Sequence, residues 1–123
     1  MLKILLVSRD KNIFEDLISA LKGYEDIESE LSESGEKALA IVSGKAVDLV
    51  IADEDLGDMT GLELVRRILK INFMINFAVV SSLAHDEFHE ASEGLGIMLQ
   101  LPKRPDEKDA KELVKTLKLI KGM

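Results

Sequence analysis

The chain has no cysteine and no tryptophan, and its 123 residues include only two prolines and one tyrosine. Disulfide bonds and thiol chemistry are therefore excluded, and the absence of cysteine agrees with a reducing compartment. Long apolar runs are also lacking, because the basic and then apolar start, Met1–Val7, gives way to Ser8–Lys11. A signal peptide or a membrane span needs a longer apolar segment, so we expect a cytoplasmic protein that makes no membrane contact.

Charge is abundant but unevenly distributed. The formal net charge is −7, although residues 103–123 carry seven basic and four acidic side chains. An acidic body repels the phosphates of nucleic acids, and the basic tail is interleaved with acids and lacks aromatic residues, so we expect no direct binding of DNA or RNA. With 46% hydrophobic residues and no break in composition, residues 1–123 predict a single domain that folds without a metal or a disulfide.

Apolar runs of strand length alternate with segments of helical periodicity along the whole chain. This alternation predicts α/β architecture, in which strand–helix units repeat around a parallel sheet. The expected strands are Ile4–Val7, Ile27–Leu31, Val47–Ala52, Phe77–Ser81 and Ile97–Leu101. The second of these is expected at an edge of the sheet, because only one of its faces is apolar.

Helical patterns fill the intervals between the expected strands. Apolar stripes of helical spacing occupy the first and last intervals. Their members are Phe14, Leu17, Ile18, Leu21, Ala110, Leu113, Val114 and Leu117. Ser34 is typical of a helix N-cap, and another helix is expected over Gly61–Lys70. A short helix indicated by Phe88, Ala91 and Leu95 is expected to stop at the nearby glycines.

Polar residues gather immediately after four of the expected strands. They are Ser8–Asp10, Asp53–Asp55, Ser81–Ser82 and Lys103. In doubly wound sheets, ligands and reactive groups collect beyond the carboxyl ends of the strands. An aspartate nucleophile, with a lysine and a serine on the phosphoryl oxygens, would suit phosphoryl transfer there. Strand ends are also polar simply because they meet water, and the residues alone leave both interpretations open.

Several segments carry a more specific pattern. Lys3–Val7 is an apolar strand, and Asp48–Asp53 is a second one that ends in an aspartate. Leu56–Leu64 is similar to the motif Met-Pro-x-Met-Asp-Gly-x-Glu-Leu, while Ser81 follows the aspartate by 28 residues and Lys103 follows Ser81 by 22. At these spacings the chain resembles, over nearly its whole length, the receiver domain of two-component response regulators.

The resemblance implies a fold and a function. The fold would be three-layer, doubly wound and flavodoxin-like, with a parallel five-stranded sheet in the order 2-1-3-4-5. Asp53 would be the phosphoacceptor, receiving a phosphoryl group from a histidine kinase or a phosphotransfer protein, and Ser81 and Lys103 would contact the phosphate. The chain would then act as a phosphorelay signalling module and not as an enzyme, with a downstream protein as a further partner.

The acidic pair that holds magnesium in this family is missing, because Ser8 and Arg9 stand at its two positions. If Arg9 pointed inward to about 5 Å from a divalent ion, the repulsion would be about 6–7 kcal/mol at an effective dielectric of about 20. We therefore expect weak Mg²⁺ binding and slow or absent phosphorylation, with Arg9 placed against Asp53 as a permanent counterion. Two alternatives remain open: Asp10 or Asp55 supplies a substitute metal ligand, or Arg9 turns toward solvent.

Further departures from the family pattern surround the expected site. Gly57 and Thr60 replace the proline and the aspartate of the motif, and Arg104 separates Lys103 from its proline. The family's aromatic switch position falls at Gln100, whose polar amide cannot bury against the sheet as a ring does. The usual relay from the hydroxyl to the aromatic ring is therefore not expected in its ordinary form.

Other functions compete with the receiver interpretation. A phosphorylation-independent pseudo-receiver would dock on a protein partner, or form a homodimer, through its last strand and last two helices. That surface would include Arg104, Lys108, Lys111 and Lys115.

A small phosphatase of the haloacid-dehalogenase type would use Asp53 as nucleophile and Asp55 as proton donor. His85–His89 is similar to a His-Glu-x-x-His zinc motif, but Asp86 replaces the glutamate, which favours an ordinary solvated helix face.

Overall fold

The computed structural model describes all residues 1–123 and contains one parallel sheet of five strands. The strands are β1 (Leu2–Val7), β2 (Ile27–Ser32), β3 (Leu49–Ala52), β4 (Asn76–Val80) and β5 (Ile97–Leu101). They lie in the order β2-β1-β3-β4-β5, so β2 and β5 form the two edges. The predicted strand order and the edge position of the second strand are both confirmed.

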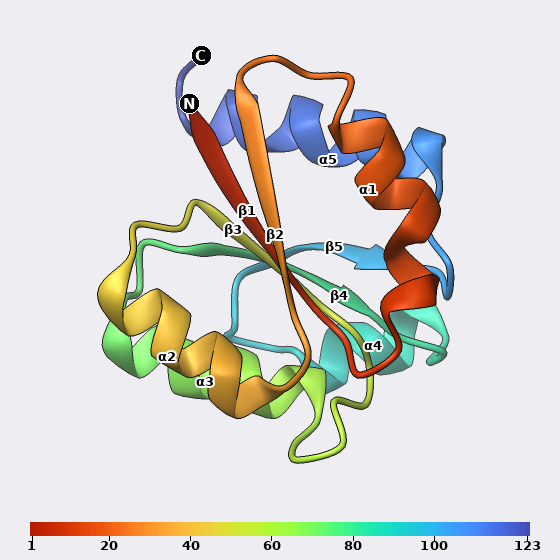
Figure 1. Cartoon of the computed structure of the whole chain (residues 1–123). Coiled ribbons are helices and arrows are strands. Elements are labelled where there is room, and N and C mark those ends of the chain that lie inside the picture. The colour runs from red at the N-terminus through yellow and green to blue at the C-terminus, as the bar shows by residue number, and fades with distance from the viewer.

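Helices connect the strands and cover both faces of the sheet. They are the short 3-10 helix η1 (Lys11–Phe14), α1 (Glu15–Leu21), α2 (Gly35–Gly44), α3 (Gly61–Ile71), α4 (His85–Ala91) and α5 (Glu107–Ile120). In Figure 1, α1 and α5 lie on one side of the sheet, and α2, α3 and α4 lie on the other. None of the helices combines the length and the apolar composition required to cross a bilayer.

Two apolar layers hold the helices to the sheet, and alternate residues of each central strand point into opposite layers. In β1, Ile4 and Leu6 pack with α1 and α5, whereas Leu5 and Val7 pack with α2, α3 and α4. All four of these side chains are fully buried. Because the central strands are apolar on both faces, they read as continuous hydrophobic runs in the sequence.

Element boundaries differ from the predicted ones by one or two residues in most places. β1 begins at Leu2 and β3 at Leu49, and β4 is shifted by one residue toward the amino terminus. Ser34 caps α2 as expected, since its side chain accepts a hydrogen bond from the Lys37 amide. The prediction placed Leu95 with the fourth helix, but α4 ends at Ala91, and Gly94 (φ 82°) and Gly96 (φ 65°) carry the chain in left-handed turns to β5.

One carboxylate fastens the end of α5 to the start of the sheet. Asp48 Oδ2 accepts a hydrogen bond from the Lys3 amide at 2.8 Å, and its Oδ1 pairs with Lys121 Nζ at 2.9 Å. Burial alone would raise the pKa of Asp48, but the bonds from Lys121 and from the Lys3 backbone outweigh burial and hold the pKa below its ordinary value of 3.8. The ionised form is therefore the one that the fold favours.

This geometry predicts a stability difference that depends on pH. Asp48→Ala should lower the free energy of unfolding at pH 7 by about 1–3 kcal/mol, since it removes two hydrogen bonds to a charged, half-buried group. The folded pKa is depressed, so the contribution of Asp48 is present at neutral pH and is lost as the pH falls through the folded pKa, below 3.8. Urea unfolding at pH 7 and pH 3 should show that the difference in the free energy of unfolding between wild type and Asp48→Ala is smaller at pH 3. Glu25→Ala, at an exposed position, serves as the control. An equal difference between wild type and Asp48→Ala at both pH values would contradict a stabilising role of the ionised Asp48.

Candidate functional site

The polar residues that follow the strands are held at one edge by backbone pairing that continues past each strand. The Ser8 amide donates to the Ser32 carbonyl at 3.0 Å, the Asp53 amide to the Val7 carbonyl at 2.9 Å, and the Ser81 amide to the Leu101 carbonyl at 3.2 Å. The sheet therefore fixes the backbone of the first residue in each turn, and with it the position from which each polar side chain extends.

Asp53 is half-buried and has a hydrogen bond to each carboxylate oxygen. Its Oδ1 accepts from the Glu54 amide at 2.7 Å, and its Oδ2 lies 2.9 Å from the hydroxyl of Ser8. Ser8 is only 1% exposed, and its oxygen also lies 2.9 Å from the Asp10 carbonyl. A hydroxyl has a single proton, and the carboxylate is the stronger acceptor, so Ser8 donates to Asp53.

Arg9 does not lie against Asp53 as the counterion hypothesis expected. Its Nη2 pairs instead with Asp55 Oδ2 at 3.0 Å, and the arginine side chain is 60% exposed. Successive residues point in different directions, so the buried Ser8 faces the aspartate while Arg9 faces outward. Gly57 (φ +87°) makes room for this arrangement, because a Cβ there would lie 3.3 Å from Arg9 Cδ.

The two candidate substitute metal ligands are occupied by the chain itself. Asp10 Oδ1 accepts the Asn12 amide at 3.0 Å and so caps η1, while Asp55 Oδ1 accepts the Gly57 amide at 2.9 Å and Oδ2 holds Arg9. No group of three histidine, cysteine or acidic side chains converges as a metal-binding set. The donor set therefore does not fit a magnesium ion that needs several free carboxylate oxygens.

These residues surround a hollow of about 260 Å³ at the carboxyl edge of the sheet. Its lining consists of Arg9, Asp10, Ile13, Asp53, Glu54, Asp55, Val80 and Lys103. Four carboxylates against two cations leave a formal charge of −2. An estimate from Asp53, Lys103 and Arg9 alone gives the opposite sign, +1, because it leaves out three acids that the fold brings to the same hollow.

Ser81 lies beside this hollow and is bound to a residue that the sequence analysis did not single out. Its hydroxyl is 3.4 Å from Glu54 Oε2, which also accepts the Ser82 amide at 3.0 Å and the Ser82 hydroxyl at 3.1 Å. The sequence feature that could have predicted this contact is a pair of serines after one strand and a glutamate after the neighbouring strand. Lys103 lines the hollow and is exposed.

Gln100, at the expected switch position, is half-buried and fixed to the loop that carries Ser81. Its Nε2 donates to the Leu83 carbonyl at 2.8 Å and to the Ser81 carbonyl at 3.3 Å. The amide therefore connects β5 to the β4–α4 loop by hydrogen bonds, where an aromatic ring would act by packing.

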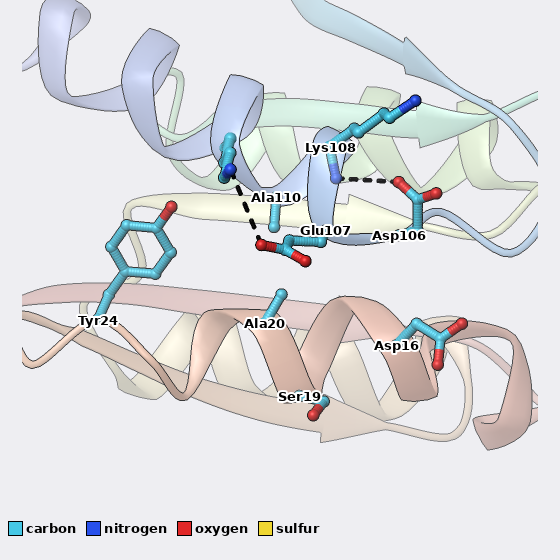
Figure 2. Close-up of a pocket in the computed structure, with 9 residues that line it drawn as sticks. Asp16, Ser19, Ala20, Tyr24, Asp106, Glu107, Lys108 and Ala110 are labelled. Atoms are coloured by element: carbon cyan, nitrogen blue, oxygen red, sulfur yellow. Dashed lines mark hydrogen bonds and ion pairs between the residues drawn. The ribbon is translucent and has the colours of Figure 1, made fainter.

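A larger hollow, of about 510 Å³, lies between α1 and the start of α5 (Figure 2). Its polar groups are engaged in the local structure of α5: Asp106 accepts the Lys108 amide at 3.0 Å, and Glu107 pairs with Lys111 at 3.8 Å. None of the candidate residues from the strand ends lines it. His85 and His89 are both exposed on α4, as in a solvated helix face.

The fold and the site define a class before any relative is considered: a doubly wound α/β domain with an aspartate at the carboxyl edge of its central strand. The sequence profile of the response regulator receiver domain matches residues 4–117. The chain therefore belongs to the response regulator receiver domain family, which serves two-component signal transduction. No curated protein matches the chain.

Solved structures agree in fold. The chemotaxis response regulator CheY4 of Vibrio cholerae has a TM-score of 0.82 at 20% identity, covering 95% of this chain and 98% of that one. A CheY-like receiver domain protein from Methanospirillum hungatei has a TM-score of 0.81 at 25% identity, with 94% and 92% covered. The non-phosphorylated HemR receiver domain of Leptospira biflexa has a TM-score of 0.80 at 24% identity, with 95% and 94% covered.

The site depends on a close backbone approach at Gly61, the first residue of α3. A Cβ on Gly61 would collide with the backbone oxygen of Asp53. Gly61→Ala should therefore lower the free energy of unfolding by about 1–3 kcal/mol and shift the amide resonances of Asp53 and Glu54. Gly44→Ala is the matched control, because Gly44 also lies in a helix but has open space at its Cβ. Equal stability of the two variants in urea unfolding would refute the close approach.

Proposed function

We propose that this chain is a receiver module of a phosphorelay in which Asp53 is the phosphoacceptor. The observation that carries the proposal is the position of its carboxylate, at the end of the central strand β3 and on the wall of an open hollow that Lys103 also lines. Receiver domains typically interact with histidine kinases. The partner for this chain is therefore the phosphorylated histidine of a kinase or of a phosphotransfer protein.

The chemistry is an in-line transfer to a carboxylate oxygen. An oxygen of Asp53 attacks the phosphorus, a new P–O bond forms, and the P–N bond of the phosphohistidine breaks. The imidazole nitrogen keeps the bonding electron pair and takes up a proton from water. Lys103 offsets negative charge on the phosphoryl oxygens, and Ser81 can donate its hydroxyl proton to one of them.

Two features of the site support slow phosphorylation. The hollow carries a formal charge of −2, which repels an incoming phosphoryl donor. In addition, Ser8 is a neutral donor to Asp53, and it stands where the family carries an acid. Magnesium would supply charge neutralisation if it were bound, but the carboxylates here do not form a set that fits it.

Acceptor function is tested by incubating the protein with acetyl phosphate and magnesium and weighing the intact chain. We expect a phosphate adduct that forms slowly, because of the acidic hollow, and that is absent from Asp53→Asn. Ser81→Ala should reduce the yield of the adduct without abolishing it. An adduct that persists in Asp53→Asn, or no adduct after prolonged incubation, would refute the assignment of Asp53 as acceptor.

Magnesium affinity provides a separate prediction. The double substitution Ser8→Asp and Arg9→Asp changes the formal charge of the hollow by −3, and it should strengthen Mg²⁺ binding at least tenfold. Calorimetric titration of the two proteins gives the measurement. Lys11→Ala, which also removes a positive charge near this loop, controls for a general charge effect. An unchanged Mg²⁺ affinity in the double variant would refute the argument from the missing acidic pair.

A phosphorylation-independent interaction module is the second candidate, and the Ser8–Asp53 hydrogen bond favours it because it occupies the acceptor without a phosphate. A partner that binds wild type and Asp53→Asn with equal affinity would identify this role.

We propose a signalling role over catalysis, since Asp55, the acid of a phosphatase mechanism, is engaged by Arg9 and the Gly57 amide.

A further inference from the structure

The carboxylate of Glu54 lies across the gap between the end of β3 and the end of β4. One oxygen, Oε2, has three donors around it: the Ser82 amide at 3.0 Å, the Ser82 hydroxyl at 3.1 Å and the Ser81 hydroxyl at 3.4 Å. These partners are 27 and 28 residues away in the sequence, so the contact is tertiary and not a local turn.

The three donors form a cradle for an oxyanion. The Ser81 hydroxyl accepts the Leu83 amide at 3.2 Å, which leaves its single proton free to point toward Glu54. Two hydroxyls and a backbone amide converging on one charged oxygen are the groups that stabilise a negatively charged oxygen in phosphoryl or acyl sites. Ser82 and Glu54 are both exposed, so a solvent-borne oxyanion can reach the same donors.

We propose that Glu54 is a built-in competitor at the Ser81 end of the site, so that a phosphoryl group on Asp53 gains the Ser81 and Ser82 donors only when the Glu54 carboxylate leaves them. The proposal rests on the proposed function, since the relevant phosphoryl group is the one that Asp53 would carry. Both proposals involve Ser81, because it is the expected phosphate contact and its hydroxyl also lies against Glu54.

Electrostatics connects the release of Glu54 to the charge on Asp53. Glu54 follows Asp53 directly, and its amide donates to Asp53 Oδ1 at 2.7 Å, so a phosphoryl group on Asp53 adds negative charge close to the Glu54 carboxylate. Repulsion between these groups favours release of the Glu54 side chain, while the freed donors favour capture of a phosphoryl oxygen. An exposed carboxylate held by hydrogen bonds is weakly bound on the scale of protein stability, which lets it exchange.

Gln100 restricts what the release can move. Its amide holds the Ser81 and Leu83 carbonyls from the β5 side, while Glu54 holds Ser81 and Ser82 from the β3 side. When Glu54 leaves, the β4–α4 loop therefore remains attached to β5. The departure removes the side-chain bonds between the loop and the end of β3, and it changes the charge presented by the exposed surface next to α4.

The contact is tested first without any phosphorylation, in the full chain labelled with ¹⁵N. The Ser82 amide should exchange its hydrogen at least tenfold faster in Glu54→Ala than in wild type, because its acceptor is gone. Glu93→Ala, which removes an exposed acid from a loop beyond α4, should leave this rate unchanged. Equal exchange at Ser82 in wild type and Glu54→Ala would overturn the proposal.

Competition is tested next with inorganic phosphate as the probe, by following the Ser81 and Ser82 amide resonances. Glu54→Ala should bind phosphate at least tenfold more tightly than wild type, and it should do so in an Asp53→Asn background as well. Ser82→Ala in the Glu54→Ala protein should reverse the gain. Faster Ser82 exchange without tighter phosphate binding would overturn the competition.

These readouts separate the two proposals. If no Asp53-dependent adduct forms with acetyl phosphate in any variant, the acceptor function fails, while amide exchange and phosphate binding still decide whether Glu54 occupies an oxyanion subsite. If the adduct forms equally fast in wild type and Glu54→Ala, and the phosphate affinities are also equal, the acceptor function stands and the role of Glu54 is refuted.

Discussion

The backbone hydrogen bond from the Asp53 amide to the Val7 carbonyl, 2.9 Å long, joins the ends of the two central strands. Ser8 comes directly after the acceptor and Asp53 is the donor, so both polar turns start from this bond. The contact between the Ser8 hydroxyl and Asp53, and the place of Glu54 beside β4, follow from it. The parallel register of β1, β3 and β4 is thus the constraint that turns separate sequence motifs into one site.

The fold could be predicted from the sequence because buried positions are apolar and recur with the period of a strand or a helix. The apolar runs predicted all five strands, and the apolar stripes around Leu17 and Leu113 correctly marked the faces of α1 and α5 that pack on the sheet. Boundaries were less certain, since capping and turn geometry decide them. Leu95 was assigned to a helix by its spacing, but left-handed glycines on either side place it in a turn.

The site was only partly predictable, because motif spacing identifies positions and does not give side-chain partners. Ser8, Asp53, Ser81 and Lys103 were named from strand ends. One hypothesis placed Arg9 against Asp53 and the alternative turned it toward solvent, whereas the structure pairs an exposed Arg9 with Asp55. Glu54 was not recognised as a functional group, since its partners, Ser81 and Ser82, lie in the loop that follows another strand, β4. The net charge of the hollow was not predictable either, because only the fold shows that Asp10, Glu54 and Asp55 line it together with Asp53.

The loop after β3 carries a further consequence for how this sequence can change over generations. A side chain at position 57 would require both a left-handed backbone and a displaced Arg9. An acid at position 9 would in turn leave Asp55 without its cation and place two carboxylates near each other. A single substitution is thus penalised at either position, and Arg9, Asp55 and Gly57 are expected to change together in sequences that keep this loop.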